Sequence, residues 1–302
     1  MSNITEQIEQ LKKEKNAVIL AHYYVPDEVQ AVADYIGDSF YLSKIATTVE
    51  QETIVFCGVS FMGESAKILN PEKTVLMPDA TADCPMAHMA DAEKIAAVRR
   101  QYEDVAVVCY INSIGEIKKH ADVCVTSANA MKIVKALPNK NIYFIPDEHL
   151  GRYIASKVPE KNFIFNDGFC HVHAQYTAEA AKRAKEAHPE ALLLVHPESR
   201  MEILEQADYI GSTSGIIDYA TQSDAKEFII GTELGVMYEL KQKNPDKKFY
   251  PMVENQICMD MKKITLEKVV QCMQEGTGLV EVKEELRESA NAPLNRMLEL
   301  AK

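Results

Sequence analysis

Short runs of apolar residues recur along the chain in three series with nearly the same spacing. The first run of each series covers residues 17–21, 105–109 and 191–195. Runs of this length are typical of strands that are buried on both faces of a parallel sheet. A segment with helical spacing follows each run, and residues 35–36 then form a second short strand in the first series. The pattern therefore predicts alternating strands and helices.

Two more apolar runs follow in every series. The third run covers residues 53–57, 142–145 and 228–230, and the fourth run covers residues 74–77, 162–165 and 248–250. The intervals are long enough for the crossover helices that parallel strands require. We therefore expect an α/β protein of three homologous three-layer α/β/α domains, each with a four-stranded parallel sheet.

Polar residues keep the same period as the strands, which indicates three copies of one unit. Four sets recur at spacings of 86 and 88 residues: His22, Tyr110 and His196; Tyr24, Asn112 and Glu198; Ser39, Ser127 and Thr213; Cys84, Cys170 and Cys258. We expect domains at residues 1–86, 87–172 and 173–302, the last including a tail with helices at residues 262–274 and 281–302. Each of the first two domains ends shortly after its cysteine.

The repeated polar residues follow predicted strands directly, with the cysteines after the fourth strand of each unit. Ligands of open parallel sheets lie outside the carboxyl ends of the strands. If the three units pack around a pseudo-threefold axis with these edges inward, the three sets meet in one central cavity. The sequence therefore predicts a single site built by all three domains.

Composition and charge narrow the class of protein. The chain has 302 residues, 47% of them apolar and 26% charged, and a net charge of −12. This acidity argues against a nucleic-acid backbone as a partner. The sequence contains no apolar run of about 18 residues, and its first 15 residues lack the apolar core of a signal peptide. We therefore expect a cytoplasmic protein without a membrane partner.

The seven cysteines fall into two groups. Cys57, Cys109, Cys124 and Cys272 stand in apolar surroundings and are expected in the core. Three converging thiols cannot all pair, but they can bind a metal. Neither a CxxC pair, typical of structural zinc sites, nor a CxxxCxxC motif is present. A [4Fe–4S] cluster with one iron not held by protein fits such a trio.

Two other interpretations remain open at this stage. The first is a zinc enzyme with three cysteine ligands that hydrolyses a phosphorylated substrate. The second is a cluster-based redox or iron sensor that uses the cavity as a ligand pocket. A sensor would need a partner surface or a DNA-binding element, and the acidic sequence indicates neither.

Several ordered motifs resemble those of the quinolinate synthase family. They are His22-Tyr23-Tyr24, Gly37-Asp38-Ser39, Asp83-Cys84-Pro85-Met86, Tyr110-Ile111-Asn112, Gly168-Phe169-Cys170-His171-Val172-His173, His196-Pro197-Glu198 and Gly211-Ser212-Thr213. The resemblance runs from His22 to Cys258 and continues into the tail. It implies condensation of iminosuccinate with dihydroxyacetone phosphate to quinolinate, phosphate and water, in de novo NAD biosynthesis.

The resemblance also implies the residues of the site. It implies one [4Fe–4S] cluster held by Cys84, Cys170 and Cys258. It implies a substrate site lined by His22, Ser39, Tyr110, Ile111, Asn112, Ser127, His196, Pro197, Glu198 and Thr213. An L-aspartate oxidase or dehydrogenase would supply the short-lived iminosuccinate.

The chemistry of the reaction suggests individual roles for these side chains. Phosphate loss and dehydration need proton shuttles, for which His22, Tyr24, Tyr110, His196 and Glu198 are candidates. We expect Glu198 to act as a base near the open iron, and Tyr24 with His22 to form a proton-transfer pair. Packing against a neighbouring domain is the alternative role for Tyr24. The glycines at 276 and 278 could let the tail act as a lid, or could form a plain turn between helices.

Overall fold

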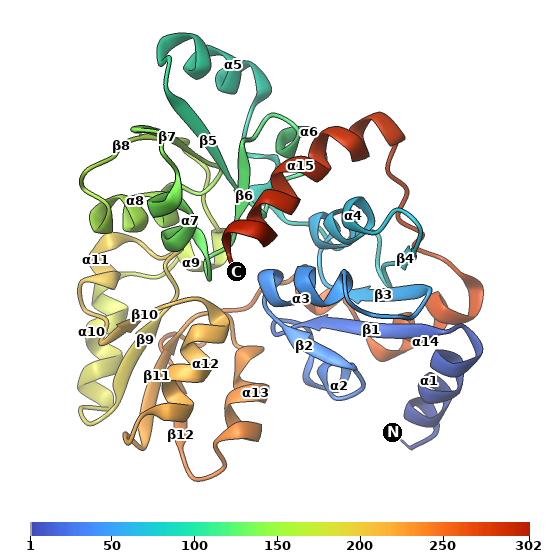
Figure 1. The fold of residues 1–302 in the computed structure, drawn as a ribbon. Helices are drawn as coiled ribbons and strands as arrows, with labels where there is room; N and C mark the ends of the chain where they lie inside the picture. The colour runs from blue at the N-terminus through green and yellow to red at the C-terminus, as the bar shows by residue number, and fades with distance from the viewer. Residues whose placement is uncertain (1) are drawn as a thin grey trace.

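A computed structural model describes residues 2–302, and it shows three separate four-stranded sheets in which every strand pair is parallel. The strand orders are β2-β1-β3-β4, β6-β5-β7-β8 and β10-β9-β11-β12. We call these sheets and their helices the first, second and third units. Figure 1 shows the three sheets around a common centre, as expected for three homologous α/β/α domains.

The strands lie close to their predicted positions. The first sheet contains β1 (Ala17–His22), β2 (Tyr35–Gly37), β3 (Thr53–Cys57) and β4 (Thr74–Leu76). The second contains β5 (Val105–Tyr110), β6 (Val123–Val125), β7 (Asn141–Ile145) and β8 (Asn162–Phe165). The third contains β9 (Leu192–Val195), β10 (Tyr209–Ile210), β11 (Glu227–Gly231) and β12 (Lys248–Pro251).

Helices connect the strands. The first unit has α1 (Ser2–Glu14), α2 (Asp27–Gln30), α3 (Ser39–Ala46), α4 (Ser60–Leu69) and the 3₁₀ helix η1 (Pro85–His88). The second has α5 (Ala92–Gln101), α6 (Gly115–Lys118), α7 (Ala130–Ala136), α8 (Glu148–Lys157) and α9 (His171–Ala174). The third has α10 (Ala178–Ala187), α11 (Met201–Leu204), α12 (Thr213–Gln222), α13 (Val236–Lys243) and η2 (Met261–Lys263). Within residues 2–302, no helix has the length and apolarity needed to cross a membrane.

The first strands of the first two units, β1 and β5, extend one residue further than the sequence predicts. We expected His22 and Tyr110 to follow their strands, but each is the last strand residue. The reason is register, because His22 pairs with Gly37 of β2 and Tyr110 pairs with Val125 of β6. His196 does follow its strand, since β9 ends at Val195.

The tail packs on the first and second units instead of extending the third. Helix α14 (Leu266–Glu275) packs against α1, and α15 (Glu284–Leu300) crosses α4, α6 and β6 (Figure 1). Thr265 caps α14 by accepting a hydrogen bond from the Lys268 N–H. Gly276 ends this helix with φ 67°, a conformation that favours glycine. These contacts favour the plain turn between helices over a lid.

Candidate active site

One cavity lies where the three units meet, and the predicted polar residues converge on it. Its wall includes every polar residue of our predicted site: His22, Tyr24, Ser39, Cys84, Tyr110, Asn112, Ser127, Cys170, His196, Glu198, Thr213 and Cys258. Two predicted residues are not part of this wall. Ile111 and Pro197 are buried, and the Ile111 side chain belongs to the hydrophobic core.

The three cysteines reach the cavity from three different loops. Cys84 directly precedes η1, Cys170 is the N-cap of α9, and Cys258 lies just before η2. All three are half-buried free thiols. Burial raises the thiol pKa of Cys84, with Cys258 and Glu198 adding to the effect, and raises that of Cys258 to about 11. The other four cysteines are buried, as predicted.

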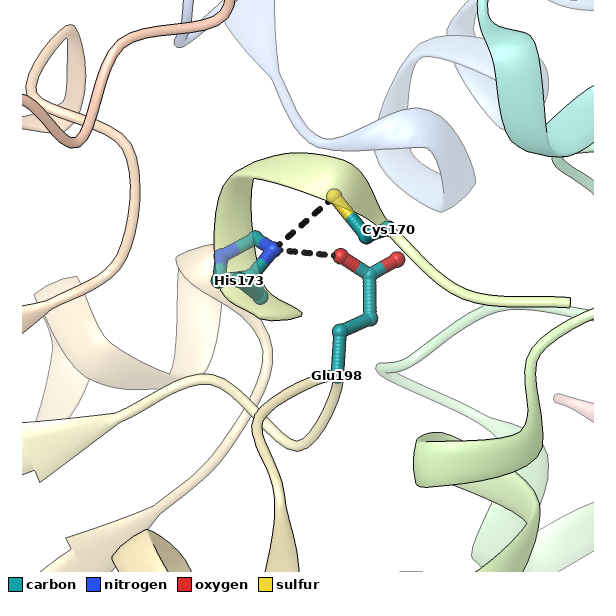
Figure 2. A group of neighbouring side chains, drawn as sticks. All are labelled: Cys170, His173 and Glu198. Carbon is teal, nitrogen blue, oxygen red and sulfur yellow. Dashed lines mark hydrogen bonds and ion pairs between the residues drawn. The ribbon is translucent and has the colours of Figure 1, made fainter. Parts of the chain in front are cut away.

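Glu198 is a buried carboxylate among ring nitrogens and a phenol. Its Oε2 lies 2.7 Å from His173 Nδ1 (Figure 2). The same oxygen lies 3.5 Å from His196 Nδ1. Burial alone would raise its pKa, but the hydrogen bonds from His173 and the Tyr110 hydroxyl outweigh burial and hold the pKa well below its usual range. Glu198 is therefore ionised and can accept hydrogen bonds or a proton.

His173 is a site residue that the sequence analysis did not assign. It lies on α9 three residues after Cys170, with its Nδ1 3.2 Å from the Cys170 sulfur and its Nε2 3.0 Å from the Thr232 hydroxyl. Its ring stacks on His196 with a centroid distance of 4.8 Å. The spacing of three residues on a helix was the only available signal, because the equivalent positions in the other repeats are alanine and methionine.

Tyr24 bridges the first and third units. Its hydroxyl lies 2.7 Å from Thr213 Oγ1 and 2.8 Å from Thr232 Oγ1. Burial, reinforced by the negative charge of Glu198, raises the pKa of the phenol well above its ordinary value. The phenol is therefore protonated and can donate its proton within a row of hydroxyl groups.

The two repeat-related histidines are neutral. Burial lowers the pKa of His22 and of His196 to about 3. In each ring Nδ1 accepts a backbone N–H, from Tyr24 at 3.2 Å and from Glu198 at 3.3 Å. The proton of each neutral ring is therefore on Nε2, and that of His196 faces the Ser127 hydroxyl at 3.2 Å.

The cavity wall offers many neutral donors and no cationic side chain. Among the described residues that line it there is no lysine or arginine. Ser39 and Thr213 are the first residues of α3 and α12, so backbone N–H groups at these helix ends complement the hydroxyls. The arrangement can hold an anion by hydrogen bonds and helix dipoles.

A family model for "Quinolinate synthetase A protein" matches residues 6–299. The chain belongs to the quinolinate synthetase A family. The quinolinate synthase of Caldicellulosiruptor saccharolyticus is 50% identical over 301 residues, which cover 100% of this chain and 99% of the relative. That of Clostridioides difficile is 52% identical over 299 residues, covering 99% and 98%. Membership in this family makes the protein an enzyme of NAD biosynthesis.

Proposed function

We propose that the protein condenses iminosuccinate with dihydroxyacetone phosphate to give quinolinate, phosphate and water, using one [4Fe–4S] cluster. The observation that carries this proposal is the convergence of three repeat-related cysteines, one from each unit, on the same polar cavity. The relatives named quinolinate synthase support the same reaction.

The donor set fits the cluster. Cys84, Cys170 and Cys258 are free, and no fourth cysteine is among the described residues that line the cavity. Thiolates are the ligands that iron–sulfur clusters prefer, and three of them leave one iron open. When bound, this iron supplies a Lewis acid for a substrate hydroxyl or carboxylate. Binding would release protons from the three thiols, whose pKa values burial raises.

Neutral donors bind the anionic substrates. Ser39, Asn112, Ser127 and Thr213 come from all three units and offer hydroxyl or amide groups to carboxylate and phosphate oxygens. Without a lysine or arginine on the described wall, binding depends on geometry more than on charge. Such a site selects the spacing of the anionic groups and releases an anionic product without a strong ion pair to break.

Proton transfer involves an ionised carboxylate that can accept a proton and a phenol that can donate one. Glu198 is an ionised carboxylate within 4.8 Å of the Cys170 sulfur, so we assign it as the base, and the Tyr110 hydroxyl that contacts it is positioned to move a proton. Tyr24 keeps its proton and donates it, with the neutral His22 beside it at a ring distance of 4.5 Å. The neutral His196 orients its Nε2–H toward Ser127. Buried side chains such as these exclude bulk water from reactive intermediates.

Iminosuccinate is short-lived, so this proposal also requires a supplier. We propose an L-aspartate oxidase or dehydrogenase as that supplier and the cytoplasm as the location of both enzymes. Coupling production of iminosuccinate to this enzyme in one reaction mixture tests the requirement directly.

A zinc hydrolase is the second candidate, and one observation favours it. Cys170, His173 and Glu198 each offer one ligand atom, and these atoms lie within 4.8 Å of one another (Figure 2). Sulfur, imidazole nitrogen and carboxylate oxygen are all zinc ligands. In the structure, however, His173 and Glu198 satisfy each other at 2.7 Å.

Metal and sulfide analysis of anaerobically purified protein separates the two candidates. We expect about four irons and four sulfides per chain, together with visible absorption, and loss of both in Cys170→Ser. Cys109→Ser is the matched control, because Cys109 is buried in β5 and does not line the cavity. One zinc without sulfide would overturn the cluster and favour hydrolysis. Formation of quinolinate from the two substrates completes the test.

A further inference from the structure

Glu233 is a buried carboxylate on the cavity wall that the reaction scheme above does not use. It lies two residues after β11 with no exposed surface. Its Oε1 accepts a hydrogen bond from the backbone N–H of Cys258 at 3.1 Å. Its Oε2 accepts one from the Gly235 N–H at 2.6 Å. One carboxylate thus holds the loop of a cluster cysteine and the turn that leads into α13.

Lys262 connects this carboxylate to the first unit. Its ammonium lies 2.9 Å from Glu233 Oε1 and also donates to the Tyr24 carbonyl oxygen at 2.6 Å. The backbone N–H of Lys262 bonds to the Cys258 carbonyl at 3.2 Å, so the lysine lies one turn beyond the cysteine. A single side chain therefore joins the Cys258 loop to the backbone of Tyr24.

The turn at Gly235 provides a second connection between the same two units. A Cβ at Gly235 would lie 2.7 Å from the Tyr24 Cα atom, so only glycine permits this approach. The buried Gln30 side chain donates to the Gly235 and Tyr23 carbonyls. Because Glu233 accepts a hydrogen bond from the Gly235 N–H, it also fixes the turn that packs against the Tyr24 backbone.

Carboxylates also face the N–H groups of the other two cysteines. Asp147, which is 86 residues before Glu233 and follows β7, interacts with the Cys170 N–H. In the first unit the equivalent position is Val59, and Asp83 instead interacts with the Cys84 N–H. A carboxylate thus lies close to each of the three cysteines, and in the third unit the contact is the 3.1 Å hydrogen bond from the Cys258 N–H to Glu233.

We propose that Glu233 and Lys262 are positioning residues: Glu233 fixes the Cys258 loop for cluster binding, and Lys262 ties that loop to Tyr24 across the boundary between units. The pair acts through neighbouring residues and does not itself react. This inference rests on the proposed function, because it assumes a cluster at Cys258. Ligand-supporting contacts of this kind typically change metal affinity or activity by about 10- to 100-fold.

The test uses anaerobic holoenzyme and four variants. Glu233→Gln keeps the shape but removes the charge, and Glu233→Asp keeps the charge but shortens the side chain. Lys262→Met removes the ammonium, and Lys262→Arg retains a cation. The matched controls are Glu227→Gln and Lys248→Met, because these two side chains form an ion pair of the same 2.9 Å length at the other end of β11.

Three measurements are made on each protein: the rate at which a chelator bleaches the cluster, the electron paramagnetic resonance spectrum of the reduced cluster, and kcat with KM. We expect both Glu233 variants to lose iron about tenfold faster and to show altered spectra. We expect Lys262→Met to lower kcat about tenfold at nearly constant KM, and Lys262→Arg to recover most of it. The controls should match the wild type.

The outcomes distinguish the proposed function from the positioning role of Glu233 and Lys262. Wild type without iron and sulfide overturns the proposed function and this inference together. If the wild type contains a cluster but the Glu233 variants bleach at the same rate and give the same spectra as the wild type, only the positioning role is overturned. Equal losses in the Glu227 and Lys248 controls would also overturn it, because they would show a general effect on the third unit. Thermal unfolding identifies a misfolded variant. If one variant at a position is misfolded, the other folded variant at that position decides whether the residue has the proposed role.

Discussion

The first and third units each place a histidine at the end of the first strand and a reactive side chain two residues later. His22 and His196 both accept the N–H of that later residue on Nδ1, and burial lowers the pKa of both rings to about 3. In the first unit the later residue is Tyr24, and in the third it is Glu198. The repeated backbone thus presents a phenol in one unit and a carboxylate in the other.

The surroundings of these two side chains differ as much as their chemistry does. Tyr24 lies between two threonine hydroxyls, whereas Glu198 lies against His173 and the Tyr110 hydroxyl. Burial raises the pKa of the phenol, while hydrogen bonds and nearby rings lower that of the carboxylate. The comparison shows that a repeat can fix geometry while the neighbouring units set protonation.

The substitution Glu198→Gln should give the largest effect. The amide keeps the shape but cannot take up a proton, and it removes the charge that acts on both Tyr24 and Tyr110. We expect turnover to fall at least about 100-fold with the cluster retained. Single-turnover formation of quinolinate, with iron analysis, measures both. Exposed Glu202 provides the control Glu202→Gln, and nearly normal turnover of Glu198→Gln would show that Glu198 is not the base.

Tyr24→Phe should give a smaller effect on the same reaction. The ring keeps its packing, but the proton and two hydroxyl contacts are lost, so kcat should fall about 10- to 100-fold with a smaller change in KM. Tyr23→Phe is the matched control, because Tyr23 is adjacent and outside the cavity wall. If both variants retain the wild-type kcat, packing is the only role of Tyr24.

Much of the fold is readable in the sequence because strands buried on both faces appear as short apolar runs. Residues 53–57 and 162–165 were predicted with the bounds that the structure has. The ends of β1 and β5 were missed by one residue, because pairing with a neighbouring strand decides where a strand stops. The domain boundaries, at residues 86 and 172, stay a prediction, since helices α14 and α15 pack back on earlier units.

The site was only partly predictable, and the missed residues share a physical cause. His173 and Glu233 have no polar equivalents in the first unit, where Ala87 and Val59 occupy those positions. Their roles depend on contacts with Glu198 and Lys262 that form only when distant segments pack together. Periodicity detects residues that every copy keeps, whereas the pairs His173 with Glu198 and Glu233 with Lys262 are each arranged only once.

The last expected effect is on stability in mild acid and not on turnover, and it tests the shared feature of the two units. His22 and His196 have a pKa of about 3 in the fold against roughly 6.5 when unfolded, so the unfolded chain binds more protons between these values. Stability should therefore fall as the pH drops below about 6.5, by up to about 1.4 kcal/mol per pH unit for each ring. Denaturant unfolding at several pH values should show a shallower slope in His22→Gln and in His196→Gln, but not in the control His188→Gln, whose half-buried ring stacks on Tyr250 outside the cavity wall. An unchanged slope in either variant would mean that its ring is not neutral in the fold. The two units would then share the backbone N–H contact to Nδ1 but not the protonation state of the histidine.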